Sequence, residues 1–254
     1  MPAQNDWGFR KMARVFITGS ADGLGQLAAN ALIAQGHQVV LHARNEKRGQ
    51  DALDRVPGAE DVVTADLTSI DETKQLASKV NELGKFEAVI HNAGVYQGSG
   101  EEIFSVNTVA PYILTCLVKR PVRLIYLTSG MHQQGRSKLE SFKTNISRIT
   151  YSDSKLHVLM LCKAVARRWP QVYANAVDPG WVPTKMGGRG APDDLQKGYE
   201  TQVWLAVSND DNAKVSGRYF HHQQESTHNP EANDVRLQER FLELCKEITG
   251  VSFP

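Results

Sequence analysis

Several features that mark other classes of protein are missing from this 254-residue sequence. Its three cysteines, Cys116, Cys162 and Cys245, are odd in number and far apart, and no Cys-x-x-Cys pair occurs, so neither a disulfide framework nor a zinc site is indicated. No apolar run approaches the roughly 18 residues of a membrane-spanning helix. The first ten residues are polar and lack the apolar segment of a signal peptide. We therefore expect a reduced, cytoplasmic protein that needs no metal and no membrane.

An excess of charge of either sign is also absent. The chain carries 29 basic and 28 acidic residues, which gives a formal net charge of +1, and both signs are spread along its length. This balance favours neither nucleic acid nor a membrane surface as a partner. There is no internal repeat and no low-complexity linker, and the hydrophobic fraction of 41% is enough for a core. We expect a single domain over residues 1–254, with a loose extension at residues 1–11.

A glycine-rich turn joins the first expected strand to the first expected helix. The apolar run at residues 14–18 leads into Gly19-Ser-Ala-Asp-Gly23-Leu-Gly25, and an apolar helical pattern follows. Strand, glycine turn and helix bind a dinucleotide pyrophosphate, because glycines admit the backbone to the phosphates and the helix N-terminus offers free N–H groups. The alternative is a glycine-rich turn that binds no ligand.

The end of the second expected strand, residues 37–43, indicates which dinucleotide would bind. An NAD site usually has an acidic residue there to hold the ribose 2′-hydroxyl. Here Ala43 takes that position and Arg44 follows it, with Lys47 and Arg48 close by. A guanidinium in place of a carboxylate suits a 2′-phosphate, so NADP (NADPH) is favoured over NAD. An ordinary solvated loop is the alternative.

Further apolar runs alternate with helical patterns along the rest of the chain. The expected strands span residues 14–18, 37–43, 61–66, 86–91, 123–129, 172–177 and 218–220. This alternation predicts an α/β fold with a doubly wound parallel sheet of about seven strands and helices on both faces. Right-handed crossovers then place the glycine turn and Ser129 on the same rim of the sheet.

Polar residues follow several of these strands, where parallel sheets bind their ligands. Asp66 ends the third strand and could accept a hydrogen bond from an adenine amino group or cap the next helix. Asn92 and Gly94 follow the fourth strand, and Ser129 ends the fifth. Asn107 lies among apolar residues of a helix, either as a buried structural hydrogen-bonding residue or as part of a relay.

Three segments of the chain have no regular pattern of their own. Residues 130–150 are rich in polar side chains and indicate a surface insertion. Residues 185–198 are rich in glycine and charge and favour a mobile lid. Residues 221–254 form a tail that ends in an expected helix at residues 235–248. Substrate specificity would reside in these segments, which carry no readable code.

Tyr151 and Lys155 stand four residues apart at the start of an expected amphipathic helix. Side chains at this spacing share one face of a helix, so the phenol and the ammonium group lie side by side. A neighbouring cation favours the phenolate, which makes the pair a candidate acid or base. The spacing alone is common by chance, and other motifs are needed to support this function.

The ordered set of motifs resembles the short-chain dehydrogenase/reductase family from Val15 to about Phe220. The matching motifs are Thr18-Gly19-x-x-x-Gly23-x-Gly25, Asp66-Leu67, Asn92-Ala-Gly94, Asn107, Ser129, Tyr151-x-x-x-Lys155 and Pro179-Gly180. The resemblance implies a single-domain Rossmann fold and hydride transfer between a nicotinamide and a carbonyl or alcohol carbon. The motif Ser129-Gly-Met-His132 and the long segment after it resemble the retinol-dehydrogenase-like branch.

The resemblance also implies a role for each matching residue. Tyr151 would donate or accept the proton, Ser129 would hold the substrate oxygen, Lys155 would bind the nicotinamide ribose and lower the tyrosine pKa, and Asn107 would support a proton path. The implied cofactor contacts are Gly19, Gly23, Leu24, Gly25, Asp66, Leu67, Asn92, Gly94, Tyr151, Lys155, Pro179, Val182 and Thr184, to which the charge at the end of the second strand adds Arg44. Trp181 would line the substrate mouth or serve in packing.

Two departures from the family pattern affect these expectations. His91 stands where the family often has asparagine, which puts one hydrogen bond at the strand end in question. The helix after Asn107 is short, and because that helix often forms the family's dimer face, the chain could be a homodimer or a monomer. The expected partner is a small, apolar carbonyl or alcohol substrate, whose identity and direction of conversion stay open.

Two other functions are compatible with the same fold. A non-catalytic NAD(P)-binding sensor or scaffold would be expected to lose the serine, tyrosine or lysine, and all three are present. A sugar-nucleotide epimerase or dehydratase also uses Tyr-x-x-x-Lys. Those enzymes usually carry a longer C-terminal substrate domain and a Gly-x-x-Gly-x-x-Gly turn, and this chain has neither.

Overall fold

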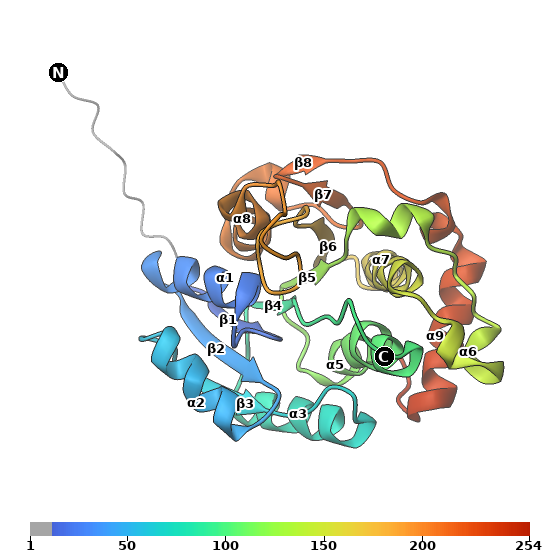
Figure 1. Ribbon diagram of the computed structural model, residues 1–254, viewed down its shortest axis with the longest axis horizontal. Coiled ribbons are helices and arrows are strands. Elements are labelled where there is room, and N and C mark those ends of the chain that lie inside the picture. Colours follow the sequence, from blue (N-terminus) through green and yellow to red (C-terminus); the bar gives the residue numbers. More distant parts are fainter. Residues whose placement is uncertain (1–11) are drawn as a thin grey trace.

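The computed structural model describes residues 12–254, so the extension expected at residues 1–11 lies outside the described part of the chain. One sheet with the strand order β3-β2-β1-β4-β5-β6-β7-β8 crosses the molecule (Figure 1). The strands are β1 (Arg14–Ile17), β2 (Gln38–Ala43), β3 (Asp61–Thr64), β4 (Ala88–His91), β5 (Arg123–Leu127), β6 (Tyr173–Asp178), β7 (Tyr219–His221) and β8 (Gln224–Glu225). The first seven are parallel, and β8 pairs with β7 in the antiparallel sense.

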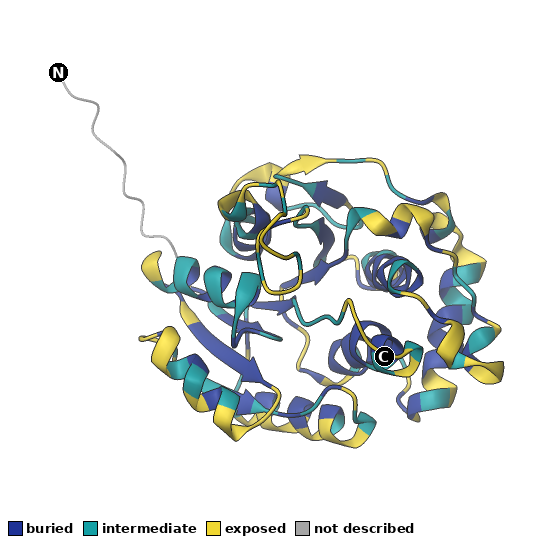
Figure 2. Ribbon diagram, viewed as in Figure 1, coloured by how far each residue is buried: buried dark blue, intermediate teal, exposed yellow. Residues whose placement is uncertain are grey.

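Helices cover both faces of this sheet, as the alternating pattern predicts, and the doubly wound α/β fold is confirmed. One core lies under α1 (Gly23–Ala34), α2 (Glu46–Arg55) and α8 (Leu195–Val207). The other lies under α3 (Ile70–Glu82), α5 (Ala110–Leu117) and α7 (Tyr151–Arg168), and α9 (Val235–Thr249) packs on the outside of α7. The central strands are mostly buried, β8 is exposed, and exposed residues lie mainly on the helices and loops (Figure 2).

The strand order places the candidate ligand residues together. The order reverses between β1 and β4, which are neighbours in the sheet although β2 and β3 separate them in the sequence. Loops that leave the carboxyl ends of two such strands diverge and open a crevice at the sheet edge. The glycine turn after β1 and the segment Asn92–Gly94 after β4 form this crevice.

Helix α2 is the clearest element that the sequence pattern does not predict. The segment after Arg44 is highly charged, and only Gly49 and Ala52 of this helix are buried. Asn45 caps the helix by accepting a hydrogen bond from the backbone N–H of Arg48 at 3.1 Å. Gly49 lets α2 pack closely on β3, because a Cβ at this position would lie 3.1 Å from the Thr64 methyl group. The apolar face is therefore too narrow for a periodicity argument to detect.

The expected insertion at residues 130–150 packs more closely than its polar composition indicates. It contains η2 (Gly130–Gln134), α6 (Ser141–Thr144) and η3 (Ile146–Arg148). Leu139, Phe142 and Ile149 are buried in the same core as α7, where the Phe142 ring packs against Phe104, His157 and Phe241. The expected lid at residues 185–198 overlaps the first turn of α8, where Gly198 is buried against Val182.

Residues 12–254 contain no helix long and apolar enough to cross a membrane. The same residues hold no group of three or more histidine, cysteine, aspartate or glutamate side chains placed to share a metal ion.

The head of α7 is held by Asp153, a buried carboxylate in the middle of the Tyr151–Lys155 motif. Thr150 and Asp153 form a reciprocal capping box. The carboxylate also accepts hydrogen bonds from the Arg136 backbone N–H at 2.9 Å and from Lys138 Nζ at 2.8 Å. Burial alone would raise its pKa, but Lys138 and these donors outweigh burial and hold the pKa below its usual value.

We expect Asp153→Asn to lower the free energy of unfolding by about 2 kcal/mol at pH 7, because it leaves the half-buried Lys138 ammonium and several donors without a carboxylate. A carboxylate with a depressed pKa stabilises the fold above its unfolded pKa of about 4 and loses that effect as pH falls. The difference between wild type and variant should therefore shrink on acidification. Denaturant titration at pH 7 and at about pH 3, below the unfolded pKa, measures both effects. Asp54→Asn, at an exposed position, is the control and should change stability little.

Candidate active site

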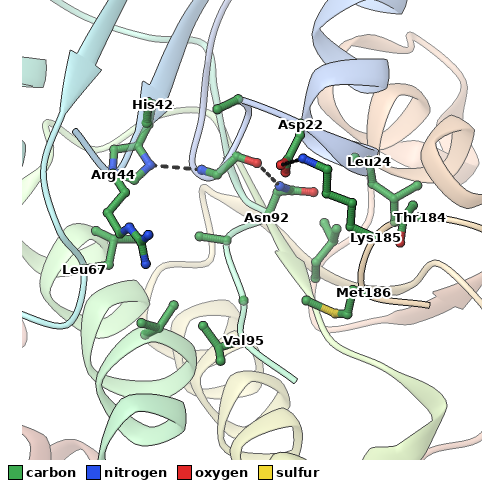
Figure 3. A pocket seen from close by; sticks show the side chains of 18 of the residues that line it. Asp22, Leu24, His42, Arg44, Leu67, Asn92, Val95, Thr184, Lys185 and Met186 are labelled. Carbon is green, nitrogen blue, oxygen red and sulfur yellow. Dashed lines mark hydrogen bonds and ion pairs between the residues drawn. The ribbon is translucent and has the colours of Figure 1, made fainter. Parts of the chain in front are cut away.

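A long cleft runs along the carboxyl edge of the sheet from the glycine turn to Tyr151. The cleft and the solvent at its mouth together occupy about 1140 Å³. Arg44 and Leu67 lie on one side, Thr184, Lys185 and Met186 lie on the other, and Asn92 lies between them (Figure 3). Of the predicted site residues, the cleft brings together Gly19, Gly23, Leu24, Arg44, Asp66, Leu67, Asn92, Gly94, Tyr151, Lys155, Pro179 and Thr184.

Close backbone contacts fix the glycine turn against the segment after β4. Asn92 Nδ2 donates to the carbonyl oxygens of Thr18 at 3.0 Å and Gly19 at 2.9 Å. A Cβ on Gly19 would lie 2.8 Å from Ala93 Cα, and one on Gly25 would lie 2.5 Å from Asn92 Nδ2. These two glycines therefore allow β1 and β4 to carry adjoining walls of the cleft. Gly25 lies behind that wall and does not line the cleft.

His42, which the sequence motifs do not single out, supports the same turn from β2. Its Nδ1 accepts a hydrogen bond from the Gly19 backbone N–H at 3.0 Å, so Nε2 is the nitrogen that donates, to the Ala65 carbonyl at 3.1 Å. Burial lowers the pKa of His42 to about 4, which keeps the ring neutral and preserves this arrangement. A histidine one residue before the predicted Ala43–Arg44 pair is the only signal that the sequence offers for it.

The end of the cleft next to β2 is rich in cations. Arg44 is exposed and has no ion-pair partner among residues 12–254. Arg48 Nη2 lies 2.6 Å from Asp22 Oδ2, which ties the glycine turn to α2. Lys185 Nζ lies 3.2 Å from the same oxygen and ties the turn to the segment after β6 (Figure 3). These three cations outnumber the carboxylates of Asp22 and Asp66, which leaves this end with a net positive charge suited to a phosphate.

Asp66 keeps one of its two predicted roles. Ser69, rather than Asp66, caps α3 by accepting the Glu72 backbone N–H at 3.2 Å. Asp66 Oδ1 instead accepts from the Thr68 backbone N–H at 3.0 Å and from the Thr68 hydroxyl at 2.8 Å. This turn holds Asp66 at the wall of the cleft. A hydrogen bond from an adenine amino group to Asp66 stays a prediction.

Tyr151 and Lys155 line the other end of the cleft, and Ser129, which caps η2 outside the cleft lining, lies next to Tyr151. Lys155 Nζ lies 5.4 Å from the centre of the Tyr151 ring and donates to the Leu127 carbonyl at 2.9 Å. The Ser129 hydroxyl is a hydrogen-bonding neighbour of the Tyr151 phenol. The Tyr96 ring packs edge-on against the Tyr151 ring, with centroids 4.9 Å apart. A helix, a strand end and a loop thus converge on one phenol.

The pKa values at this end differ from the expectation that Lys155 lowers the pKa of Tyr151. Burial raises the pKa of the Tyr151 phenol to about 12, and the Ser129 hydroxyl opposes that rise only in part. Burial also lowers the pKa of the Lys155 ammonium to about 8, against the attraction of Asp178. The protein alone therefore presents a protonated phenol at neutral pH, because desolvation outweighs the neighbouring cation.

Asn107 occupies a π-helical turn, Ser105–Val109, between α4 (Gly100–Phe104) and α5. Its Oδ1 accepts from the Val95 backbone N–H at 2.8 Å, and its Nδ2 donates to the Val95 carbonyl and to the Ser154 hydroxyl, both at 2.9 Å. Turns of this kind often occur at functional sites. The contacts match the structural hydrogen-bonding alternative, and the relay stays a prediction.

Two other sequence expectations concern residues outside the cleft. Val182 is buried against Gly198 of α8 and does not line the cleft, although Pro179 and Thr184 on either side of it do. His91 stacks on Tyr126 with centroids 4.8 Å apart and bonds Thr115 Oγ1 through Nε2 at 3.3 Å. His91 thus belongs to the core, and burial lowers its pKa to about 3.

Comparison with known proteins agrees with this architecture. Residues 13–194 match the family model described as short chain dehydrogenase. An uncharacterized oxidoreductase of Emericella nidulans is 44% identical, and the match covers 96% of this chain and 99% of that protein. Retinol dehydrogenase 14 of Mus musculus is 25% identical, over 93% of this chain and 86% of that protein.

Among solved structures, the RhlG/NADP active-site complex of Pseudomonas aeruginosa superposes with a TM-score of 0.68. The match covers 84% of this chain and 95% of that protein. At 19% identity this likeness concerns the fold alone.

Proposed function

The chain belongs to the short-chain dehydrogenase/reductase family of oxidoreductases, and we propose that it transfers hydride between NADP(H) and the carbonyl or alcohol carbon of a small, apolar substrate. The observation that carries this proposal is the meeting of the Tyr151 phenol, the Ser129 hydroxyl and the Lys155 ammonium at one end of the cleft. A non-catalytic sensor has no need of this arrangement.

The residues of the cleft fit a nicotinamide dinucleotide. Gly94 lies beside the catalytic end, where a Cβ would stand 3.2 Å from Lys155 Nζ and 3.5 Å from Asn107 Oδ1, so any larger residue would intrude. The first turn of α1 offers free backbone N–H groups to a pyrophosphate. Asp66 and Leu67 would flank the adenine, Asn92 and Lys155 would hold the nicotinamide ribose, and Pro179 and Thr184 would meet the nicotinamide. When bound, the nicotinamide supplies or accepts the hydride.

The chain's own residues provide proton transfer and orientation. Ser129 and Tyr151 hold the substrate oxygen, and Tyr151 gives up its phenolic proton as the carbonyl is reduced. Lys155, held by the Leu127 carbonyl, places a positive charge where the phenolate develops. Because the phenol is protonated at neutral pH, the site in this state is prepared for reduction rather than oxidation.

The walls near Tyr151 favour an apolar substrate. Among residues 12–254, eight large hydrophobic side chains are exposed, and four of them lie on the loops after β4, β5 and β6. These four are Tyr96, Met131, Trp181 and Met186. Trp181 is 60% exposed, which favours its predicted place at the substrate mouth over a packing role. Of the four, Tyr96 contacts the Tyr151 ring and Met186 lines the cleft. Exposed apolar side chains beside a polar centre are typical of ligand sites.

NADPH consumption with a panel of ketones and aldehydes tests the proposal. We expect one NADPH to be oxidised for each carbonyl reduced, because hydride leaves the nucleotide and stays on the product. An epimerase or dehydratase would recycle a bound nucleotide instead. If no carbonyl consumes NADPH, but NADPH still raises the melting temperature, the sensor alternative replaces this proposal.

We expect Arg44→Ala to weaken NADPH binding by about tenfold or more and to leave NADH binding nearly unchanged, because only NADPH carries the phosphate that pairs with the guanidinium. Thermal-shift titrations with the four nucleotides measure this. A ligand at about 100 times its Kd adds roughly 2.7 kcal/mol of stability. Lys47→Ala is the matched control, since Lys47 is an exposed cation of α2 outside the cleft. Stronger stabilisation by NADH in the wild type would contradict the preference for NADP.

A further inference from the structure

Asp178 ends β6 directly beside the catalytic groups, and the proposed mechanism does not use it. Its side chain is only 13% exposed. Oδ1 accepts from the Gly180 backbone N–H at 3.0 Å, and Oδ2 accepts from the Tyr219 phenol at 3.1 Å. His221 Nδ1 lies 3.5 Å from Oδ2. Hydrogen bonds to both oxygens thus fix the position of the carboxylate.

The carboxylate also touches the segment that carries Ser129. A Cβ on Gly130 would stand 3.0 Å from Asp178 Oδ2, so the absence of a side chain at Gly130 lets the carboxylate approach the residue next to Ser129. His132, two residues further on, packs its ring edge against Tyr219 with centroids 4.7 Å apart. Asp178 therefore lies where η2, β6 and β7 meet the head of α7.

We propose that Asp178 is a positioning residue of the catalytic centre, whose carboxylate places a fixed negative charge beside Lys155 and Tyr151 and anchors the segment after β6 to β7. This inference rests on the proposed function. The titratable groups that face the carboxylate are His132 from η2, Tyr151 and Lys155 from α7, Tyr219 and His221 from β7, and His222 after it.

The Asp178 carboxylate shifts the pKa of both catalytic groups in the same direction, upward. A negative charge nearby favours an ammonium over an amine and a phenol over a phenolate. Asp178 accordingly raises the pKa of Lys155, which burial lowers to about 8, and adds to the rise that burial causes in the pKa of Tyr151. Removing the carboxylate would therefore lower both pKa values. Carbonyl reduction needs both groups protonated, so its rate would fall at a lower pH.

The test is the pH profile of kcat/KM for NADPH-dependent carbonyl reduction in Asp178→Asn and Asp178→Ser. Both variants keep an oxygen that can accept from Gly180, and neither keeps the charge. We expect the alkaline limb of the profile to move down by about one pH unit in both. Asp178→Glu should return the limb toward its wild-type position. Asp211→Asn, which removes an exposed carboxylate outside the site, should leave it unchanged.

Tyr219→Phe separates charge from anchoring. It removes a hydrogen bond to Asp178 but leaves the carboxylate, so the rate should fall without movement of the limb. A purely structural role for Asp178 would give the same result in Asp178→Asn, namely a lower rate with an unmoved limb, and that outcome overturns the inference.

Nucleotide binding keeps the two proposals distinguishable. If the wild type reduces no carbonyl with NADPH, the proposed function fails, and the inference fails with it. If the wild type is active and the neutral variants still gain stability from NADPH, an unmoved limb overturns the inference about Asp178 alone. If neither neutral variant folds, the residue is structural and the inference is likewise overturned.

Discussion

A purified Tyr151→Phe variant should reduce a carbonyl substrate more slowly than the wild type by a factor of about 10² to 10⁴. The substitution removes the phenolic proton that the substrate oxygen receives, and no other acid among the described residues stands at the same point of the cleft. Ser129 stays in place and can still hold the oxygen, but a serine hydroxyl is a much weaker acid than a phenol. Lys155 is directed to the Leu127 carbonyl at 2.9 Å.

The same variant should keep its nucleotide binding and its stability. Phenylalanine retains the ring that packs edge-on against Tyr96, and the capping box of Thr150 and Asp153 does not involve the phenol. Thermal shift with NADPH should therefore match that of the wild type, while the steady-state reduction rate falls. Tyr96→Phe is the matched control, because it removes an exposed phenol in contact with the same ring and should leave most of the activity. Wild-type turnover by Tyr151→Phe would remove Tyr151 from the mechanism.

The pH dependence provides a second view of this site. With the pKa of Tyr151 raised to about 12 and that of Lys155 lowered to about 8, the first group to lose its proton on alkalinisation is the lysine. We expect the wild-type rate of reduction to decline above about pH 8 for that reason. From the sequence alone we expect the lysine to lower the pKa of the tyrosine. The structure shows the reverse, a raised tyrosine pKa, because spacing on a helix identifies neighbouring residues but does not show how deeply they are buried.

Local patterns predicted much of the fold. The apolar runs predicted all seven parallel strands, because buried parallel strands form nearly continuous hydrophobic segments. The glycine turn and the Tyr151–Lys155 spacing predicted the two ends of the cleft, because each is a short-range feature. Helix α2 escaped prediction because it packs through Gly49 and Ala52 on a narrow face.

Residues that act across the fold were the hardest to predict. Asp178 contacts Gly130, Tyr219 and His221, which lie up to 48 positions away in the sequence. The sequence motif at this place is Pro179-Gly180, and it does not include Asp178. The sequence places Asp22 only as a member of the glycine turn, although it pairs with Arg48 and Lys185. Such contacts between distant segments depend on the order of the strands in the sheet. The single sequence predicts the class of fold but not this order.

Substituting Gly19 should have the largest effect on the cleft itself. Gly19 has a φ of +62°, a conformation that costs an L-residue about 1–2 kcal/mol, and a Cβ there would also lie 2.8 Å from Ala93 Cα. This steric clash forces β1 and β4 apart where Asn92 holds them together. We expect Gly19→Ala to lower the free energy of unfolding by about 2–5 kcal/mol and to abolish nucleotide binding at concentrations that saturate the wild type.

Two other glycines separate the conformational cost from the steric cost. Gly36 has a φ of +83°, and no heavy atom lies within 4 Å of the place that a Cβ would take, so Gly36→Ala carries the conformational cost alone and should leave NADPH binding intact. Gly25 has an ordinary φ, but its Cβ would lie 2.5 Å from Asn92 Nδ2 and from the Gly19 carbonyl oxygen, so Gly25→Ala carries the steric cost alone. Denaturant titration and NADPH thermal shift on the three variants measure both costs. If Gly25→Ala binds NADPH as the wild type does, close approach of the two strand-end loops is not what shapes this cleft.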